Sequence, residues 1–194
     1  MANKIRYGLS NVYYAVGTPG SNNTMTYATP VAFPGAVSLD LSAEGETSNF
    51  YADDIAYYVT NSNNGYSGSL EMALITDDFK KDILGEITNS TTGLSWEVQD
   101  AEPVHFALMF EFKGDDKKVR HCLYNCVATR PSVGGSTKEE SIEPQTESVD
   151  LNVTSIYVAA VTASVVKSRA TEGSTAYSSF FSAVQLPTAP STST

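Results

Sequence analysis

Three adjacent pairs of aspartates are the residues of this sequence whose type and spacing could best support catalysis. The pairs are Asp53-Asp54, Asp77-Asp78 and Asp115-Asp116. Glycosidases use two carboxyl groups held at a set separation. Each pair also has a structural explanation, because the first precedes a predicted strand, the second begins a predicted helix and the third lies in a predicted hairpin loop. We therefore predict that the protein is not an enzyme, with a carboxylate-dependent hydrolase as one alternative.

The histidines and cysteines add little further chemistry. His105 and His121 could face each other across a predicted hairpin, although a satisfied or exposed strand histidine is the simpler interpretation. Cys122 and Cys126 would share one face of an extended strand about 13 Å apart, which is too far for a disulfide. We predict two small buried thiols. His121 and Cys122 would point to opposite faces and no fourth ligand follows, so we predict no metal site and no cofactor.

The elements that must position these residues are mostly strands, because the dominant hydrophobic period is two. The clearest strand spans 104–112 and is followed by a polar loop and a second strand at 119–128, which predicts a long antiparallel hairpin. A shift of apolar parity at Ser10-Asn11 predicts a β-bulge or a bend between two sheet contexts. The core row of the clearest strand consists of Val104, Phe106, Leu108, Phe110 and Phe112.

Weaker patterns predict the remaining elements. The Asn-Gly pair in 61–65 predicts a tight turn, and Trp96 lies in an apolar row with Leu94 and Val98, which favours its burial in the core. Further strands are predicted at 37–41, 55–59, 66–74, 149–153 and 157–166, the last one covered on both faces.

Two short helices are predicted between the strands. Thr76 can cap a helix over 77–84 that Gly85 terminates. Ser174 can cap a second helix near the C-terminus, and its apolar stripe would dock on a core or on a neighbouring subunit. That stripe consists of Tyr177, Phe180, Phe181 and Val184.

Length and charge bound the class of protein. The 194 residues fit one domain, which we place at 1–186 with a frayed tail rich in Pro, Ser and Thr at 187–194. The formal net charge of −10 disfavours tight nucleic-acid binding. The excess is uneven, since residues 1–110 hold 4 basic and 13 acidic side chains. No apolar run is long enough for a membrane span, and the absence of a signal peptide at the start predicts synthesis in the cytoplasm.

Six segments together resemble the major tail proteins, or tail tube proteins, of long non-contractile-tailed phages (siphoviruses) of Gram-positive bacteria. The resemblance extends over roughly 5–185. It departs from the family at 174–182, where relatives often carry acidic residues and a Trp and this chain is rich in Ser. The segments are 31–41, 50–54, 63–66, 78–86, 120–131 and 137–147, with Arg120 to Pro131 the most specific.

The resemblance implies a mainly β structural protein of the virion, a β-sandwich or barrel with one or two flanking helices and long loops. Such proteins form hexameric rings that share an inner β-barrel and stack into a hollow tube. The implied partners are other copies of the chain, the tape-measure protein in the lumen, and tail terminator and distal tail proteins at the ends. Double-stranded DNA would pass through without tight binding, and no membrane is involved.

Candidate site residues follow from this assembly. Alternation suggests that Glu139, Glu143 and Glu147 face the channel, with a solvated outer strand or an inter-ring contact as alternatives. Long polar loops could serve as arms between subunits or rings, or be plain surface loops. Their residues are Thr18, Asn22, Asn23, Asn61, Asn64, Gly114, Asp115 and Asp116. The alternative function is a virion-surface carbohydrate-binding β-sandwich.

Overall fold

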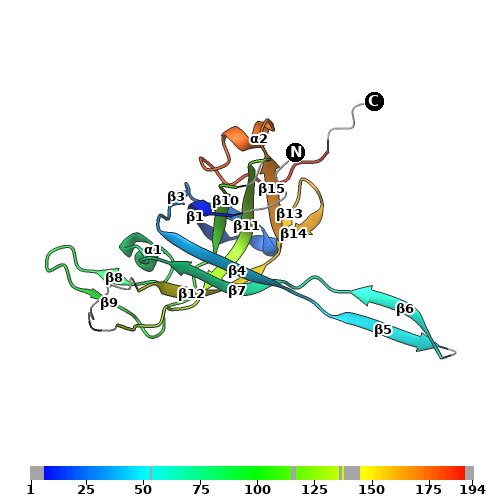
Figure 1. Ribbon diagram of the computed structural model, residues 1–194, viewed down its shortest axis with the longest axis horizontal. Coiled ribbons are helices and arrows are strands. Elements are labelled where there is room, and N and C mark those ends of the chain that lie inside the picture. The colour runs from blue at the N-terminus through cyan, green and yellow to red at the C-terminus, as the bar shows by residue number, and fades with distance from the viewer. Residues whose placement is uncertain (1–6, 53, 115–116, 136, 138–144, 191–194) are drawn as a thin grey trace.

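The computed structural model describes residues 7–52, 54–114, 117–135, 137 and 145–190 (Figure 1). The fold of this part of the chain is mainly β and antiparallel, with two short α-helices, which confirms the predicted class. Its elements are β1 (Leu9–Pro19), the 3-10 turn η1 (Ser21–Asn23), β2 (Met25–Tyr27), β3 (Val31–Ala32), β4 (Ala36–Glu44), β5 (Thr47–Ala52), β6 (Ile55–Asn61), β7 (Gly65–Met72), α1 (Asp77–Asp82), β8 (Ile87–Thr88), β9 (Ser95–Trp96), β10 (Phe106–Phe112), β11 (Val119–Ala128), β12 (Glu147–Thr154), β13 (Ile156–Val158), β14 (Ala163–Val165), β15 (Lys167–Thr171) and α2 (Thr175–Ser178).

A nine-stranded sheet forms the body, in the order β2-β1-β10-β11-β12-β7-β4, with β15 paired to β11 and β3 paired to β1. The predicted hairpin of β10 and β11 is confirmed. The predicted bulge is also present, because the register between β1 and β10 shifts between Ser10 and Tyr13, and Asn11 has φ +50°.

The long strand β11 belongs to two parts of the sheet. Its first half pairs with β15 and its second half with β12. The register against β10 slips by one residue between these halves, which reverses the side-chain parity. Cys122 and Cys126 are therefore buried on opposite faces, so the prediction that they share a face was wrong. Burial raises the pKa of both thiols, as expected for small core residues.

Two hydrophobic cores lie on the two faces of β10. The first core receives Phe106, Leu108 and Phe110, and the second receives Ala107 and Met109. The strand begins two residues later than predicted, so Val104 precedes it and packs against the first core while partly buried. Phe112, at the other end of β10, is also partly buried. A strand buried on both faces reads as a continuous apolar run, which explains why 104–112 gave the strongest signal.

Helix α1 covers the first core. The Thr76 side chain accepts a hydrogen bond from the Phe79 amide at 3.4 Å, which confirms the predicted cap. Gly85 follows the helix with φ +73°. Ser174 is the N-cap residue of α2, as predicted, but its hydroxyl donates to the Thr171 carbonyl and accepts no hydrogen bond from the helix. Phe180, beyond α2, is buried in the second core, as the apolar stripe predicted.

Three other local predictions fail. The region 157–166 is a hairpin of β13 and β14 with a turn at its centre. Trp96 lies in the short hairpin of β8 and β9 and is 42% exposed, and its neighbour Leu94 is more exposed still. The third failure is the turn predicted at 61–65.

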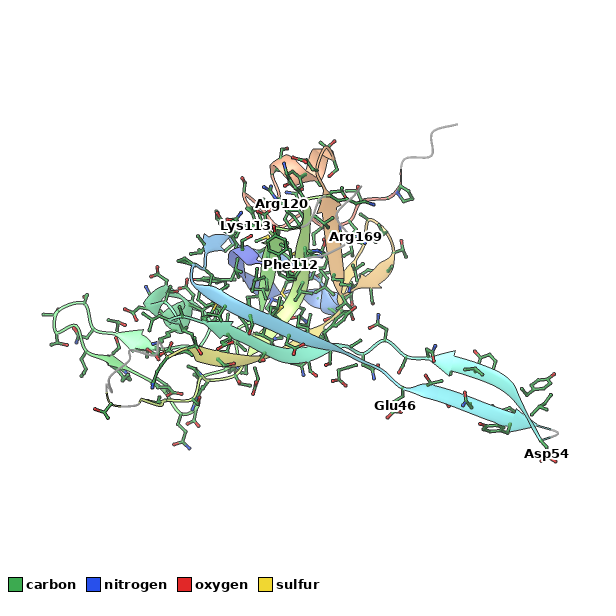
Figure 2. The ribbon with its side chains drawn as sticks, viewed as in Figure 1. Glu46, Asp54, Phe112, Lys113, Arg120 and Arg169 are labelled. Atoms are coloured by element: carbon green, nitrogen blue, oxygen red, sulfur yellow. The ribbon has the colours of Figure 1, made fainter. Side chains whose placement is uncertain are left out.

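Residues 61–65 lie on the return path of a long two-stranded projection. Strands β4 and β7 continue outward as β5 and β6, which extend away from the body (Figure 1). Asp54 lies at their tip (Figure 2). The Ser62 amide donates to the Glu46 carbonyl and the Asn64 amide to the Glu44 carbonyl, each at 2.9 Å, so pairing continues across this joint. The chain reversal occurs instead between Ala52 and Ile55, which are opposite each other, and Asp54 has φ +63°.

Candidate assembly surfaces

One face of the strands β4, β7 and β12 carries only small polar and acidic side chains. Asp40 is opposite Ser69, and Ser69 is opposite Asp150, in the central row of this face. The residues between them along each strand point the other way, into the first core. We call this surface the polar face. It consists of Ser38, Asp40, Ser42, Glu44, Ser67, Ser69, Glu71, Ser148, Asp150, Asn152 and Thr154, and includes four carboxylates without a Lys or Arg.

Hydrogen bonds between neighbouring strands order the polar face. Glu71 accepts from the Thr146 hydroxyl at 2.6 Å and from the Ser38 hydroxyl at 2.8 Å. The Ser67 hydroxyl donates to Glu44, which links β7 to β4 a second time. The bonds from Thr146 and Ser38 hold the pKa of Glu71 below its ordinary value of 4.5.

This lowered pKa predicts a pH dependence of stability. Because the folded-state pKa is below the unfolded-state value, the contribution of Glu71 is complete above pH 4.5 and is lost as the pH falls through the folded-state value. Between about pH 6 and about pH 3, the wild type should lose more unfolding free energy than Glu71→Gln does. Urea unfolding monitored by circular dichroism would measure both. Equal acid sensitivity of Glu71→Gln and the wild type would contradict the assignment.

The projecting hairpin of β5 and β6, which we call the arm, exposes apolar side chains on both faces. Phe50 is opposite Tyr58 on one face, and Tyr51 and Val59 lie on the other. Phe50 is 62% exposed and Tyr57 is 72% exposed. The sequence of the arm and its joint, 44–64, contains four carboxylates and no Lys or Arg.

A groove in the body is lined by a lysine, Lys167, and so differs in charge from the acidic arm. Its volume is about 230 Å³. Its lining residues are Leu39, Leu41, Tyr66, Phe110, Phe112, His121, Leu123 and Lys167. The Lys167 ammonium lies 4.5 Å from the centre of the Tyr66 ring. Arg169 lies opposite His121 in the pairing of β15 with β11, so the two residues share one face of the sheet. We call this the basic groove; Phe112 and Arg169 are labelled on the body in Figure 2.

Arg120, also labelled in Figure 2, is engaged within the body. Its Nε lies 3.0 Å from a Glu111 carboxylate oxygen, and its guanidinium stacks 3.8 Å from the Tyr177 ring centre and 4.5 Å from that of Phe181. Arg120 therefore fastens the C-terminal segment to β11 and is not a free rim charge.

The structure describes one residue of the predicted channel row. Glu139 and Glu143 lie outside the described residues. Glu147 begins β12 opposite Met72, on the core side of the sheet, and accepts a hydrogen bond from the Ile75 amide at 2.8 Å. The channel assignment of the row stays a prediction.

The predicted loop residues lie at three places. Thr18, Asn22 and Asn23 lie in and beside the short connection from β1 to β2, where the Asn23 side-chain amide Nδ2 donates to the Ser155 carbonyl at 3.0 Å. Asn61 and Asn64 lie at the joint of the arm, where Asn61 accepts from the Thr47 hydroxyl at 2.7 Å. Gly114 is buried against Tyr7 after β10. Asp115 and Asp116 lie outside the described residues.

The groups considered for catalysis are placed on separate elements. Asp54 is at the tip of the arm, whereas Asp77 begins α1. His105 lies 2.7 Å from the Asn125 side-chain oxygen, and His121 stacks on Phe110 at 5.3 Å, so the two histidines do not face each other. Within the described ranges, no three His, Cys, Asp or Glu side chains gather at a possible metal position. No helix in that part of the chain is long and apolar enough to cross a membrane.

The sequence reasoning missed the arm and the polar face as functional surfaces. The strand signals were present, since Ser and Asp alternate with Val and Leu at 37–42 and at 148–153. What the sequence did not reveal is that these alternating strands are neighbours, which places their polar residues on one surface.

Comparison with known proteins adds a distant likeness to a solved structure. No family model matches the chain, and no curated protein matches it. Among solved structures, the chain is similar to one in the six-fold symmetrised cryo-EM structure of the anti-feeding prophage baseplate. The two are 11% identical, the match covers 88% of this chain and 97% of the other, and the TM-score is 0.42. At this TM-score the likeness identifies neither the fold nor the role of this chain. The role is therefore inferred from the chain's own surfaces.

Proposed function

We propose that this protein is a structural virion protein, the major tail tube subunit of a siphovirus. Copies of the chain would form hexameric rings, and the rings would stack into a hollow tube that conducts phage DNA. The observation that carries the proposal is the polar face. It is a three-stranded surface of small polar and acidic side chains on a sheet whose other side is a hydrophobic core.

The chemistry of the polar face suits a channel for DNA. A duplex carries about one negative charge per 1.7 Å of its axis. Lysines and arginines would hold its phosphates. The polar face has none, and its carboxylates, such as Asp40 and Asp150, repel phosphate. DNA would therefore move along this face without being retained.

The edges of the sheet suit an assembly. Among the described strands, β4 is hydrogen-bonded only to β7, and β15 only to β11. Exposed strand edges invite pairing with another chain, and closure of a sheet into a ring removes them. A ring that joined subunits through these edges would bring the polar faces of all copies around one lumen. The tape-measure protein would occupy that lumen before DNA passes, and tail terminator and distal tail proteins would close the ends.

Electron microscopy of the purified chain tests the proposal. We expect negative-stain images of the concentrated protein to show hexameric rings or hollow tubes of uniform diameter, and sedimentation velocity to show the same large species. A chain that remains monomeric at every concentration would contradict the proposal.

A carbohydrate-binding virion protein is the second candidate, because the arm exposes the tyrosines that such sites use as platforms. Tyr51, Tyr57 and Tyr58 are all more than half exposed. A monomer that binds glycans on an array, and loses that binding in Tyr57→Ser, would favour this function over the tube.

A further inference from the structure

The first core is enclosed by a sheet that curls into an open barrel. Its strands are β1, β10, β11, β12, β7 and β4 in that order, and β4 returns to lie against β1. Each of these strands contributes side chains to the first core. The two ends of the barrel are covered differently, and the mouths of β-barrels are among the places where proteins bind small ligands.

One end of the barrel is closed by α1. Phe79 of this helix stacks on Phe33 at 4.4 Å and meets Phe106, at the start of β10, edge-on at 5.7 Å. Phe112 lies at the other end of β10, about 20 Å further along the strand. The basic groove lies at this second end, because Phe112 lines it. The helix that closes one end of the barrel therefore leaves the groove uncovered.

The walls of the basic groove are largely aromatic. The rings of Phe110, Phe112 and His121 contact one another, with centroid distances from 5.3 to 5.8 Å. The remaining apolar lining comes from β4, β7 and β11 and consists of Leu39, Leu41, Tyr66 and Leu123. Aromatic rings gain energy from offset-stacked or edge-to-face contact with other rings. These walls therefore favour an aromatic ligand over a saturated one.

The volume of the basic groove limits the size of that ligand. It is about 230 Å³. A protein cavity of about 150 Å³ lined by Leu, Ile and Phe side chains is large enough to bind benzene. The groove can therefore hold one benzene-sized ring together with a short chain, whereas a folded segment of another protein would exceed its volume.

Two cations of β15 select a negatively charged ligand. Lys167 lines the groove, and its ammonium lies 4.5 Å from the centre of the Tyr66 ring. Arg169, labelled in Figure 2, points to the same side of β15 and lies opposite His121 of the groove. Both cations are exposed, and neither forms an ion pair with a residue that the structure describes. Since no described carboxylate lines the groove, a carboxylate on the ligand would gain a charge-assisted hydrogen bond from Lys167.

We propose that the basic groove binds a small aromatic carboxylate. The aromatic ring of the ligand lies between Phe112 and Tyr66, and its carboxylate accepts a hydrogen bond from the Lys167 ammonium, with Arg169 beside it. The bound ring closes the open end of the barrel, as α1 closes the other end. The ligand stabilises the folded chain by mass action, because the groove does not exist in the unfolded chain. Binding at this groove needs no assembly, so it is independent of the proposed tube function.

Isothermal titration calorimetry on the full chain, with phenylbutyrate as the probe, tests the proposal. The uncharged phenylbutanamide has the same shape and reports the contribution of the charge, and butyrate reports that of the ring. We expect phenylbutyrate to bind with a dissociation constant in the millimolar range or tighter. The amide and butyrate should each bind at least about tenfold more weakly. A wild type that does not bind phenylbutyrate, or that binds the amide equally well, would overturn the proposal.

Two variants of the full chain locate the ligand. Lys167→Gln keeps most of the exposed side chain and removes its charge, so it should weaken the binding of phenylbutyrate at least about tenfold and leave that of the amide unchanged. Leu41→Trp fills the groove and should abolish the binding of both. Lys81→Gln removes an exposed lysine of α1, at the closed end of the barrel, and should bind like the wild type. Circular dichroism checks that each variant is folded.

The position of the bound ligand decides between the outcomes. Equal affinity for phenylbutyrate in the wild type, Lys167→Gln and Leu41→Trp would place the ligand elsewhere and overturn the proposal. Binding of a peptide that ends in phenylalanine, without binding of phenylbutyrate, would favour a protein partner and also overturn it. Tubes formed by a chain that lacks affinity for phenylbutyrate would overturn the ligand site and leave the tube function standing. A chain that stays monomeric and binds phenylbutyrate through Lys167 would do the reverse.

Discussion

Phe79→Ala is expected to lower the free energy of unfolding by about 3–5 kcal/mol. The Phe79 ring is fully buried at the centre of the first core. It stacks on Phe33 at 4.4 Å and meets the rings of Tyr14 and Phe106 edge-on at 5.2 and 5.7 Å. Truncation removes the buried area and leaves a cavity that three rigid rings cannot readily fill. Urea unfolding at a concentration below assembly would measure the loss.

The matched control is the same substitution on the arm. Phe50 is 62% exposed, so Phe50→Ala should change the unfolding free energy by less than about 0.5 kcal/mol. Comparing the unfolding free energies of the two variants distinguishes a residue that stabilises the body from an exposed residue that does not. A loss of several kcal/mol in Phe50→Ala would mean that the arm packs on its own body in solution, which would contradict the extended arm.

Lysines on the polar face are expected to convert a passive channel into a DNA-binding one. The variant carries Ser69→Lys, Asp150→Lys and Asn152→Lys, three positions on adjacent strands of that face. Wild-type tubes should not retain a short duplex. Variant tubes assembled with the duplex should retain it, and three new phosphate contacts predict that affinity falls about 40-fold between 50 and 200 mM salt.

Nuclease digestion decides whether the retained duplex lies in the lumen. DNA inside a tube of the polar-face variant should survive digestion. The control carries Ser90→Lys, Thr91→Lys and Thr92→Lys in the exposed hairpin of β8 and β9, where bound DNA should be digested. Equal digestion in both tubes would place the polar face on the outside and contradict the proposed function.

The structure shows where the charges behind the net value of −10 lie on the molecule. The arm carries carboxylates without cations, and so does the polar face, whereas the exposed cation Arg169 shares a face of the sheet with His121 of the basic groove. In the proposed tube, the carboxylates of the polar face would repel DNA.

Local signals succeeded where the physical cause was local. The Thr76 cap depends on amides within the next turn, and the bulge at Ser10-Asn11 depends on a break in alternation that the sequence displays directly. The hairpin of β10 and β11 was also predicted, because its strands are consecutive and one of them is apolar on both faces.

Predictions failed where distant pairing overrode a local preference. The Asn-Gly signal at 61–65 is a turn signal only if the flanking strands pair with each other. Here β6 pairs with β5 and β7 pairs with β4, so the segment became a joint in the arm. The apolar row that contains Trp96 predicted burial in the core. In the structure Trp96 lies in the short hairpin of β8 and β9, where its side chain stays partly exposed. Cys126 changed faces because of a register slip in β11 that depends on β10.

The sequence by itself determined the mainly β class, the principal hairpin, the first helix and the acidic charge, because alternation, capping and composition act over a few residues. Only the tertiary structure decided which strands are neighbours. That pairing gathers the serines and acids of β4, β7 and β12 on one face, and it extends two of these strands into an arm. The surface proposed to face DNA is a product of strand order, which depends on contacts between residues far apart in the chain.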